Sequence, residues 1–212
     1  MEQRVPSPLL HSFTGALLTR CVRDVPSRRV QVVLLAALVF AANAPDLDFV
    51  AGVLTDAPTR FHRGASHSLL AAGLFGLGSY LLARWAGYRS SRLFGVLMGL
   101  AFTMHIVLDM LSPRGDPYRG VALGWPLLDE RFSSPYRLFV GVRFDPRAGG
   151  FFGGLLRGDS LYHNAYVVAS EGVLVAVIWG MSRLRRSRSQ GTEKSSFPLF
   201  RGTPSRARRS RS

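Results

Sequence analysis

Three long runs without a charged residue constrain the fold of this 212-residue chain more than any other feature. They cover residues 30–45, 64–83 and 93–108, about 16, 20 and 16 residues, against the ~17–25 residues that a transmembrane helix needs. A helix that is hydrophobic on every side is buried either in a protein core or in lipid. A chain of this length has too little other material to cover several such helices. We therefore expect an all-α fold, built as a multi-helix membrane bundle.

Capping residues and prolines divide the chain into about five expected helices. Ser7 is a good N-cap with Pro8 at the first helical position, and Pro45 ends the second helix. Either Ser66 or Ser68 can cap the third helix. The expected helices cover residues 8–18, 30–42, 66–86, 92–111 and 164–181.

Two regions lack this helical pattern. Residues 114–163 are rich in glycine and proline, which predicts irregular loops with a small hairpin or a short amphipathic helix. Residues 183–212 are rich in Arg, Ser, Pro and Gly, which predicts a disordered basic tail. We therefore expect one helical domain over residues 1–182, followed by the tail.

The net charge of +14 is concentrated in that tail. Residues 183–212 hold ten Arg or Lys and one acid, Glu193, so they carry +9 and leave only +5 for residues 1–182. The body of the protein is therefore not expected to bind nucleic acid. The arginines directly behind the last apolar segment predict a cytoplasmic C-terminus. With a single cysteine, Cys21, the chain can form neither an internal disulfide nor a thiolate metal cluster.

Histidines and acids interrupt the apolar sequence near the helix ends, where an unbalanced charge costs several kcal/mol. His105 and Asp109 are one helical turn apart and leave the helix on the same face. The other members of this pattern are Asp46, Asp48, His62 and His67. A divalent metal would compensate these charges and would also explain the choice of residue types.

The mixture of imidazole and carboxylate indicates Zn²⁺, with Mn²⁺ or Fe²⁺ as alternatives. We expect extended or turn geometry at residues 45–48, where alternate side chains point in opposite directions. Only one of the two acids is then a metal ligand, and we choose Asp48, leaving Asp46 as a general base or a support. His62 would support the site or bind a second ion. Arg63 would suit an anionic substrate or an aspartate.

Each of these residues also has a simpler interpretation. A single histidine in an apolar setting is more often a hydrogen-bonded structural residue than a ligand. Trp125 fits an interfacial anchor or a core position, Glu171 either pairs with an arginine or faces the site, and His163 lies in a glycine-rich loop. The joint occurrence of four of the five histidines near the ends of apolar segments favours a site.

The ordered motifs resemble the bacterial and archaeal membrane-bound metal-dependent hydrolases of the YdjM-like family. The resemblance covers residues 5–130 and rests on Ser-Pro-x-x-His-x-x-x-Gly at 7–15, Pro-Asp-Leu-Asp at 45–48, His-Arg-Gly-x-Ser-His-Ser at 62–68, His-x-x-x-Asp at 105–109 and Trp-Pro at 125–126. It implies an all-helical protein of the inner membrane, and hydrolytic activity.

The chain is also distantly similar to the zinc-dependent phospholipase C and S1/P1-type nuclease group, whose helical enzymes hold three zinc ions. This likeness implies metal ligands at His11, Asp48, His67, His105 and Asp109. The later His-x-x-x-Glu part of that pattern has no counterpart, because His163 and Glu171 are eight residues apart. The departure favours one or two metal ions over three.

These observations predict a multi-pass inner-membrane hydrolase that uses a metal-activated water on a phosphoester or lipid headgroup. Asp46, His62 and Arg63 are the expected catalytic residues. The expected partners are membrane lipid and a small-molecule or lipid substrate, with no nucleic acid. Two alternatives remain open: a non-catalytic metal-binding membrane protein, or a membrane-tethered protein that binds anionic lipid or nucleic acid through its basic tail.

Overall fold

The structure is a computed structural model, and it describes residues 3–5, 7–22, 27–55, 61–112, 120–136, 138–145 and 151–195. The chain divides into two units, residues 1–173 and 174–212. The described elements are β1 (Gln3–Val5), α1 (Pro8–Leu18), η1 (Thr19–Cys21), α2 (Arg28–Asn43), η2 (Ala44–Leu47), α3 (Asp48–Leu54), η3 (Ala65–His67), α4 (Leu69–Trp85), α5 (Ser91–Met110), β2 (Val142–Phe144), α6 (Phe151–Leu156) and α7 (Gly158–Ser195). The prediction of an all-α bundle is confirmed.

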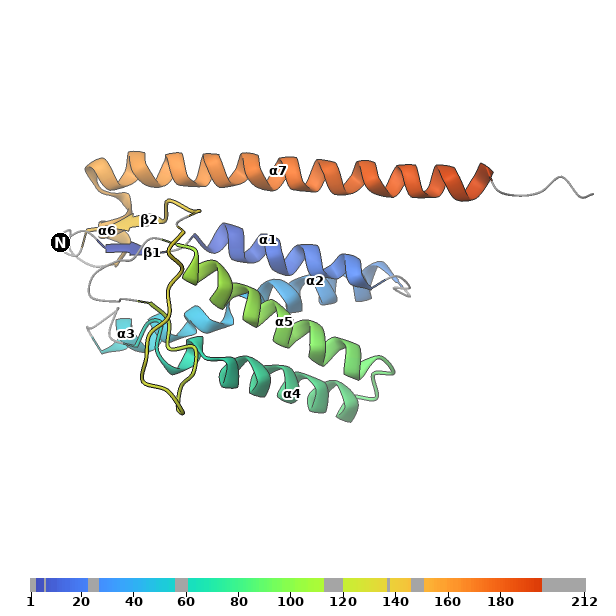
Figure 1. Ribbon diagram of the computed structural model, residues 1–212, viewed down its shortest axis with the longest axis horizontal. Coiled ribbons are helices and arrows are strands. Elements are labelled where there is room, and N and C mark those ends of the chain that lie inside the picture. Colours follow the sequence, from blue (N-terminus) through green and yellow to red (C-terminus); the bar gives the residue numbers. More distant parts are fainter. Residues whose placement is uncertain are drawn as a thin grey trace, which may run out of the picture. The chain divides into compact units, whose positions relative to one another are not determined.

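Helices α1, α2, α4 and α5 lie side by side and form the body of the first unit (Figure 1). The N-termini of α1 and α4 lie at the capping residues predicted from the sequence. The Ser7 hydroxyl accepts from the backbone N–H of Leu9, and the Ser68 hydroxyl accepts from that of Ala71. Ser68 is therefore the cap of α4, which leaves the hydroxyl of Ser66 free for another role. β1 pairs antiparallel with β2. The strand β2, predicted to lie in a local hairpin, therefore pairs with the N-terminal strand instead.

The chain between α2 and α3 differs from the prediction. Instead of extended geometry, it forms the short 3-10 helix η2, and Asp48 has helical angles of φ −61° and ψ −26°. Pro45 sits near the start of η2, where its missing N–H costs no hydrogen bond. The expectation of opposite side-chain directions at Asp46 and Asp48 was therefore based on the wrong local structure.

Two groups of buried apolar side chains hold α2, α4 and α5 together. One joins α2 to α5 through Leu34, Leu38, Ala41, Ala42, Leu97, Met98 and Ala101. The other joins η2, α4, α5 and the following loop through Ala44, Ala72, Phe102, Ile106 and Val121. The second group lies next to the predicted site residues and fixes the helix ends that carry them.

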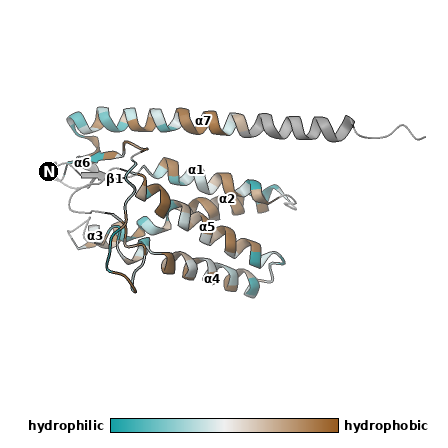
Figure 2. Cartoon of the chain, in the orientation of Figure 1, coloured by the Kyte–Doolittle hydropathy of each residue, from teal (hydrophilic) through white to brown (hydrophobic). Residues whose placement is uncertain are grey.

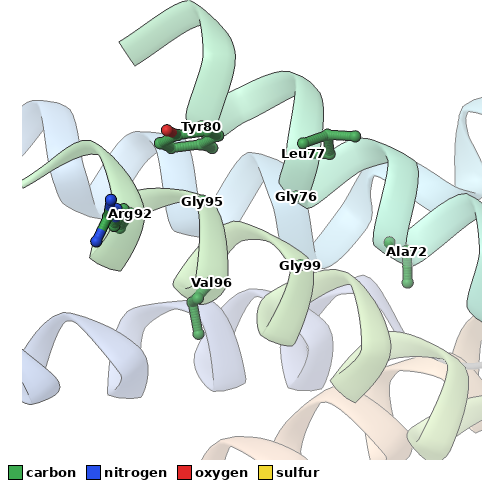
Figure 3. A pocket seen from close by; sticks show the side chains of 9 residues that line it. Ala72, Gly76, Leu77, Tyr80, Arg92, Gly95, Val96 and Gly99 are labelled. Atoms are coloured by element: carbon green, nitrogen blue, oxygen red, sulfur yellow. The ribbon is translucent and has the colours of Figure 1, made fainter. Parts of the chain in front are cut away.

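Helices α4 and α5 approach each other through glycines. A Cβ on Gly76 would lie 2.9 Å from the carbonyl oxygen of Gly95 and 3.1 Å from the Cα of Gly99. Figure 3 shows these glycines along an open groove of about 560 Å³, with Tyr80 and Arg92 at one end and Ala72 at the other. This close approach is small-residue packing of one helix on another, and of the three glycines of α4 only Gly76 takes part in it.

Gly76→Ala is therefore expected to destabilise the bundle by about 1–3 kcal/mol, because the new methyl group would collide with the backbone of α5. Gly73→Ala and Gly78→Ala are matched controls on the same helix, since a Cβ at either position meets nothing within 4 Å. The thermal unfolding midpoint in detergent measures the difference. Equal midpoints for Gly76→Ala and the controls would contradict close packing of α4 on α5.

The outer surface of the bundle is apolar. Leu70, Leu74, Leu77 and Leu81 follow one face of α4 and are 46–58% exposed. In Figure 2 hydrophobic bands recur along α2, α4 and α5, whereas the turn between α4 and α5 is hydrophilic. Three segments are long and apolar enough to cross a membrane: Arg28–Gly52, Ser91–Met110 and Gly158–Met181. The exposed leucines of α4 would be unfavourable in water, and they indicate contact with lipid.

Helix α7 continues beyond the expected helix end at residue 181 and reaches Ser195. The first part of the predicted tail, residues 183–195, is therefore helical here. The rest of the tail, residues 196–212, lies outside the described residues.

Candidate metal centre

Four separate helix ends place the predicted site residues together at one end of the bundle. His11 lies in the first turns of α1, and Asp46 lies in η2 directly after α2. His67 closes η3 just before α4, and His105 and Asp109 lie on the last two turns of α5. His11, His67, His105 and Asp109 are each at most 2% exposed. The sequence prediction that these residues form one cluster agrees with this geometry.

One group of four residues offers a ligand atom each, all within 4.8 Å of one another: Asp46, His67, His105 and Asp109. The Nε2 atom of His67 lies 3.3 Å from Oδ2 of Asp109 and 3.3 Å from Nε2 of His105. Nε2 of His105 lies 3.3 Å from Oδ1 of Asp46. This group therefore contains Asp46 at the position predicted for Asp48.

Asp48 belongs to a second group with His62 and His67. Its Oδ1 lies 3.2 Å from Nδ1 of His62, and its Oδ2 lies 3.3 Å from Nδ1 of His67. The imidazole of His67 therefore connects the two groups, with Nε2 facing the first and Nδ1 facing the second. The helical geometry at 46–48 brings both acids to the histidines, so whether Asp48 is a metal ligand stays a prediction.

Hydrogen bonds to the Nδ1 atoms orient both central histidines. Nδ1 of His105 lies 2.8 Å from the carbonyl oxygen of Ala42, which can only accept, so this nitrogen carries the proton. The hydroxyl of Ser66 donates to Asp48 over 2.6 Å and lies 3.0 Å from Nδ1 of His67, from which it can accept. In the neutral imidazoles both Nε2 atoms then carry the lone pair, which faces the four-residue group.

His11 stacks on His105, with ring centroids 3.9 Å apart and an interplanar angle of 22°. Its Nε2 lies 3.4 Å from Oδ1 of Asp109. Burial lowers the pKa of His11 below its usual value, and repulsion from His105 lowers it further, outweighing Asp109. A neutral His11 can therefore pack against the cluster without adding positive charge.

The pKa of His67 moves in the opposite direction. Burial alone would lower this pKa, but the close carboxylates of Asp109, Asp46 and Asp48 outweigh burial and raise it well above its usual value. Without a metal, these three carboxylates therefore favour the protonated form of His67. The same negative surroundings would attract a divalent cation in place of the proton.

Arg63 is the buried cation of the site, at 3% exposure. Its Nε lies 3.3 Å from Oδ2 of Asp109, which agrees with the expectation that it suits an aspartate. Its carbonyl oxygen accepts from the N–H of Ala122 and from the Arg131 side chain. These contacts hold Arg63 at φ 61°, a conformation that costs of the order of 1–3 kcal/mol for a residue other than glycine.

Three other residues considered from the sequence lie apart from both ligand groups. Nε2 of His163 binds the carbonyl oxygen of Gly141 at 3.0 Å, which is a structural role. Glu171 is buried beside Ser7, and Trp125 is 44% exposed. Sequence reasoning missed the orienting roles of Ser66 and of the Ala42 carbonyl. The position of Ser66 between His62 and His67 was a usable signal, whereas a backbone acceptor leaves none.

The chain matches the family model described as YdjM inner membrane protein over residues 7–188. The match includes α1 to α5 and both ligand groups, and it extends beyond the motifs at residues 5–130. Comparisons with curated proteins and with solved structures found no match. With its apolar helices and a family match over most of its length, this chain is a membrane protein and belongs to the YdjM inner membrane protein family.

Proposed function

We propose that this protein is a membrane-bound metal-dependent hydrolase whose substrate is a phosphoester or a lipid headgroup. One observation carries the proposal: two imidazole nitrogens and two carboxylates converge in a largely buried space. The nitrogens are Nε2 of His67 and His105, and the carboxylates belong to Asp46 and Asp109. Such a set of acceptors is unfavourable unless a cation or a proton lies among them.

The donor set fits a first-row metal. Both oxygens of Asp109 and Oδ1 of Asp46 are buried without a hydrogen-bond partner among the described residues. Two imidazoles and two carboxylates favour Zn²⁺, with Mn²⁺ or Fe²⁺ as alternatives. The Nδ1 atom of His67 is engaged by Ser66 and Asp48, which favours one ion in the four-residue group over a pair of ions bridged by His67.

A divalent metal held by these four residues would lower the pKa of a water molecule and so supply a nucleophile near neutral pH. The side chain of Asp46 is 25% exposed, whereas those of His67, His105 and Asp109 are fully buried. Water and substrate would therefore enter beside Asp46, whose carboxylate can accept a proton from the attacking water.

Arg63 and His62 complete the proposed machinery. Nη2 of Arg63 is buried without a hydrogen-bond partner in the described part of the chain, so it is available to an anionic oxygen. His62 binds Asp48, which in turn orients His67. His62 would therefore act on the reaction through this chain of contacts, and Arg63 through direct contact with the substrate.

The burial of three of the four ligands favours a second candidate, a metal site that only ties helix ends together. Such a site would have a closed ligand shell with no position for water. X-ray absorption of the metal-loaded protein separates the two, because a hydrolytic site shows an additional oxygen ligand beyond the protein side chains. A shell made up of protein ligands alone would support the structural site.

The first test is the metal content of the detergent-purified protein, measured by plasma mass spectrometry. We expect near-stoichiometric Zn, Mn or Fe in the wild type and a large loss in His67→Ala and His105→Ala. His163→Ala is the matched control, because this histidine binds a backbone carbonyl and belongs to neither ligand group. Equal, negligible metal in all four proteins after reloading would exclude the proposed hydrolase.

A further inference from the structure

Positive charges gather at the end of the bundle opposite the metal-ligand cluster. Helices α1 and α4 lead away from the cluster, and α2 and α5 return to it (Figure 1). The two connections that join α1 to α2 and α4 to α5, residues 19–29 and 84–92, contain seven arginines and one acid, Asp24, in their sequence. Residues 1–18, 30–83 and 93–182, which include the whole cluster end, contain ten arginines and eleven acids.

An uneven distribution of arginines between the two ends of a membrane protein determines which end faces the cytoplasm. Short connections rich in Arg and Lys stay in the cytoplasm. The same rule applies to Arg183, Arg185, Arg186 and Arg188, which directly follow the candidate span Gly158–Met181. The arginine-rich connections of the bundle are therefore expected in the cytoplasm, which puts the cluster on the other side of the membrane.

Large apolar side chains are also exposed at the cluster end. Val50 and Leu54 of α3 are 55% and 80% exposed. The turn at residues 124–128 follows the strand-like segment that contacts Arg63, and it exposes Trp125 and Leu127 by 44% and 89%. Tryptophan with aliphatic neighbours is typical of the membrane interface, where lipid headgroups meet the hydrocarbon core.

We infer that the cluster lies at the non-cytoplasmic face of the membrane and that its substrate is an anionic phospholipid headgroup of that leaflet. The orientation depends on charge alone, whereas the substrate class rests on the function proposed above. In the reaction, the oxygen of water forms a bond to phosphorus, one phosphorus–oxygen ester bond breaks, and the departing alcohol takes up the proton. Nη2 of Arg63, which has no hydrogen-bond partner among the described residues, would contact an oxygen of the anionic headgroup.

The single cysteine provides a direct test of orientation. Cys21 is exposed and lies in η1 at the arginine-rich turn. A membrane-impermeant maleimide should label Cys21 in inverted membrane vesicles and not in right-side-out spheroplasts. The variant Cys21→Ser with Leu127→Cys should show the reverse pattern, and labelling in detergent checks that each thiol is reactive. Labelling of Cys21 in spheroplasts, or of Leu127→Cys in inverted vesicles, would overturn the orientation.

A second experiment tests the substrate class with the purified, zinc-loaded full-length protein. Its rate on phosphatidylglycerol in mixed micelles is compared with its rate on the same glycerol phosphodiester without acyl chains, with His105→Ala as the inactive reference. Faster hydrolysis of the acylated compound is expected. Equal rates would replace the lipid by a soluble phosphoester, and no hydrolysis of either would overturn the substrate class.

The two experiments fail separately. The maleimide pattern requires neither bound metal nor activity, so a reversed pattern with normal metal content rejects the orientation and leaves the hydrolase proposal intact. Absence of metal with the expected labelling pattern rejects the hydrolase proposal and leaves the orientation intact.

Discussion

Asp109→Asn is expected to remove the metal and also to destabilise the protein by about 3–5 kcal/mol, the cost of leaving one partner of a buried ion pair alone. Asp109 is 2% exposed and Arg63 is 3% exposed, so water cannot replace the lost interaction. The same carboxylate lies 3.3 Å from His67 and 3.4 Å from His11. Metal content and the thermal unfolding midpoint in detergent measure the two effects independently.

A double variant separates the ion pair from the metal site. Arg63→Met combined with Asp109→Asn removes both charges, so most of the lost stability should return while the metal content stays low. Asp159→Asn is the control, because this acid is exposed and belongs to neither ligand group. Wild-type metal content in Asp109→Asn would show that Asp109 serves Arg63 alone.

The fold was largely predictable because its helices are marked by strong local signals. Uncharged apolar runs, the Ser7 cap with Pro8 and the alternatives at Ser66 and Ser68 located α1, α2, α4 and α5 to within a few residues. The continuation of α7 to Ser195 was not predicted, because the polar, arginine-rich composition of residues 183–195 carries no hydrophobic pattern.

The sequence predicted which residues form the candidate site, but it did not predict how these residues are arranged. Histidines and acids near the ends of apolar segments must meet if the helices form one bundle, so the membership of the cluster followed from sequence. Which of Asp46 and Asp48 belongs to which ligand group did not follow from sequence, because it depends on the helical turn η2 rather than on residue type. The tautomer of His105 depends on the backbone carbonyl of Ala42, 63 residues away in sequence, which only the tertiary structure reveals.

The other large expected effect is the response of the folded protein to metal removal. EDTA should lower the thermal unfolding midpoint of the wild type, because a metal that binds only the folded state stabilises it. At a free metal concentration 1,000 times the dissociation constant, the stabilisation is about 4.1 kcal/mol. The ligands come from η2, η3 and α5, so the metal would tie together segments that otherwise meet through carboxylates of like charge.

Two variants identify the origin of that response. His163→Ala should lose as much stability in EDTA as the wild type, since His163 belongs to neither ligand group. His105→Ala should start from a lower midpoint and show little further change, because Nε2 of His105 faces Asp46 and His67 within the four-residue group. An equal shift in both variants would mean that EDTA acts elsewhere, and the protons on the histidines would then be sufficient to balance the buried acids.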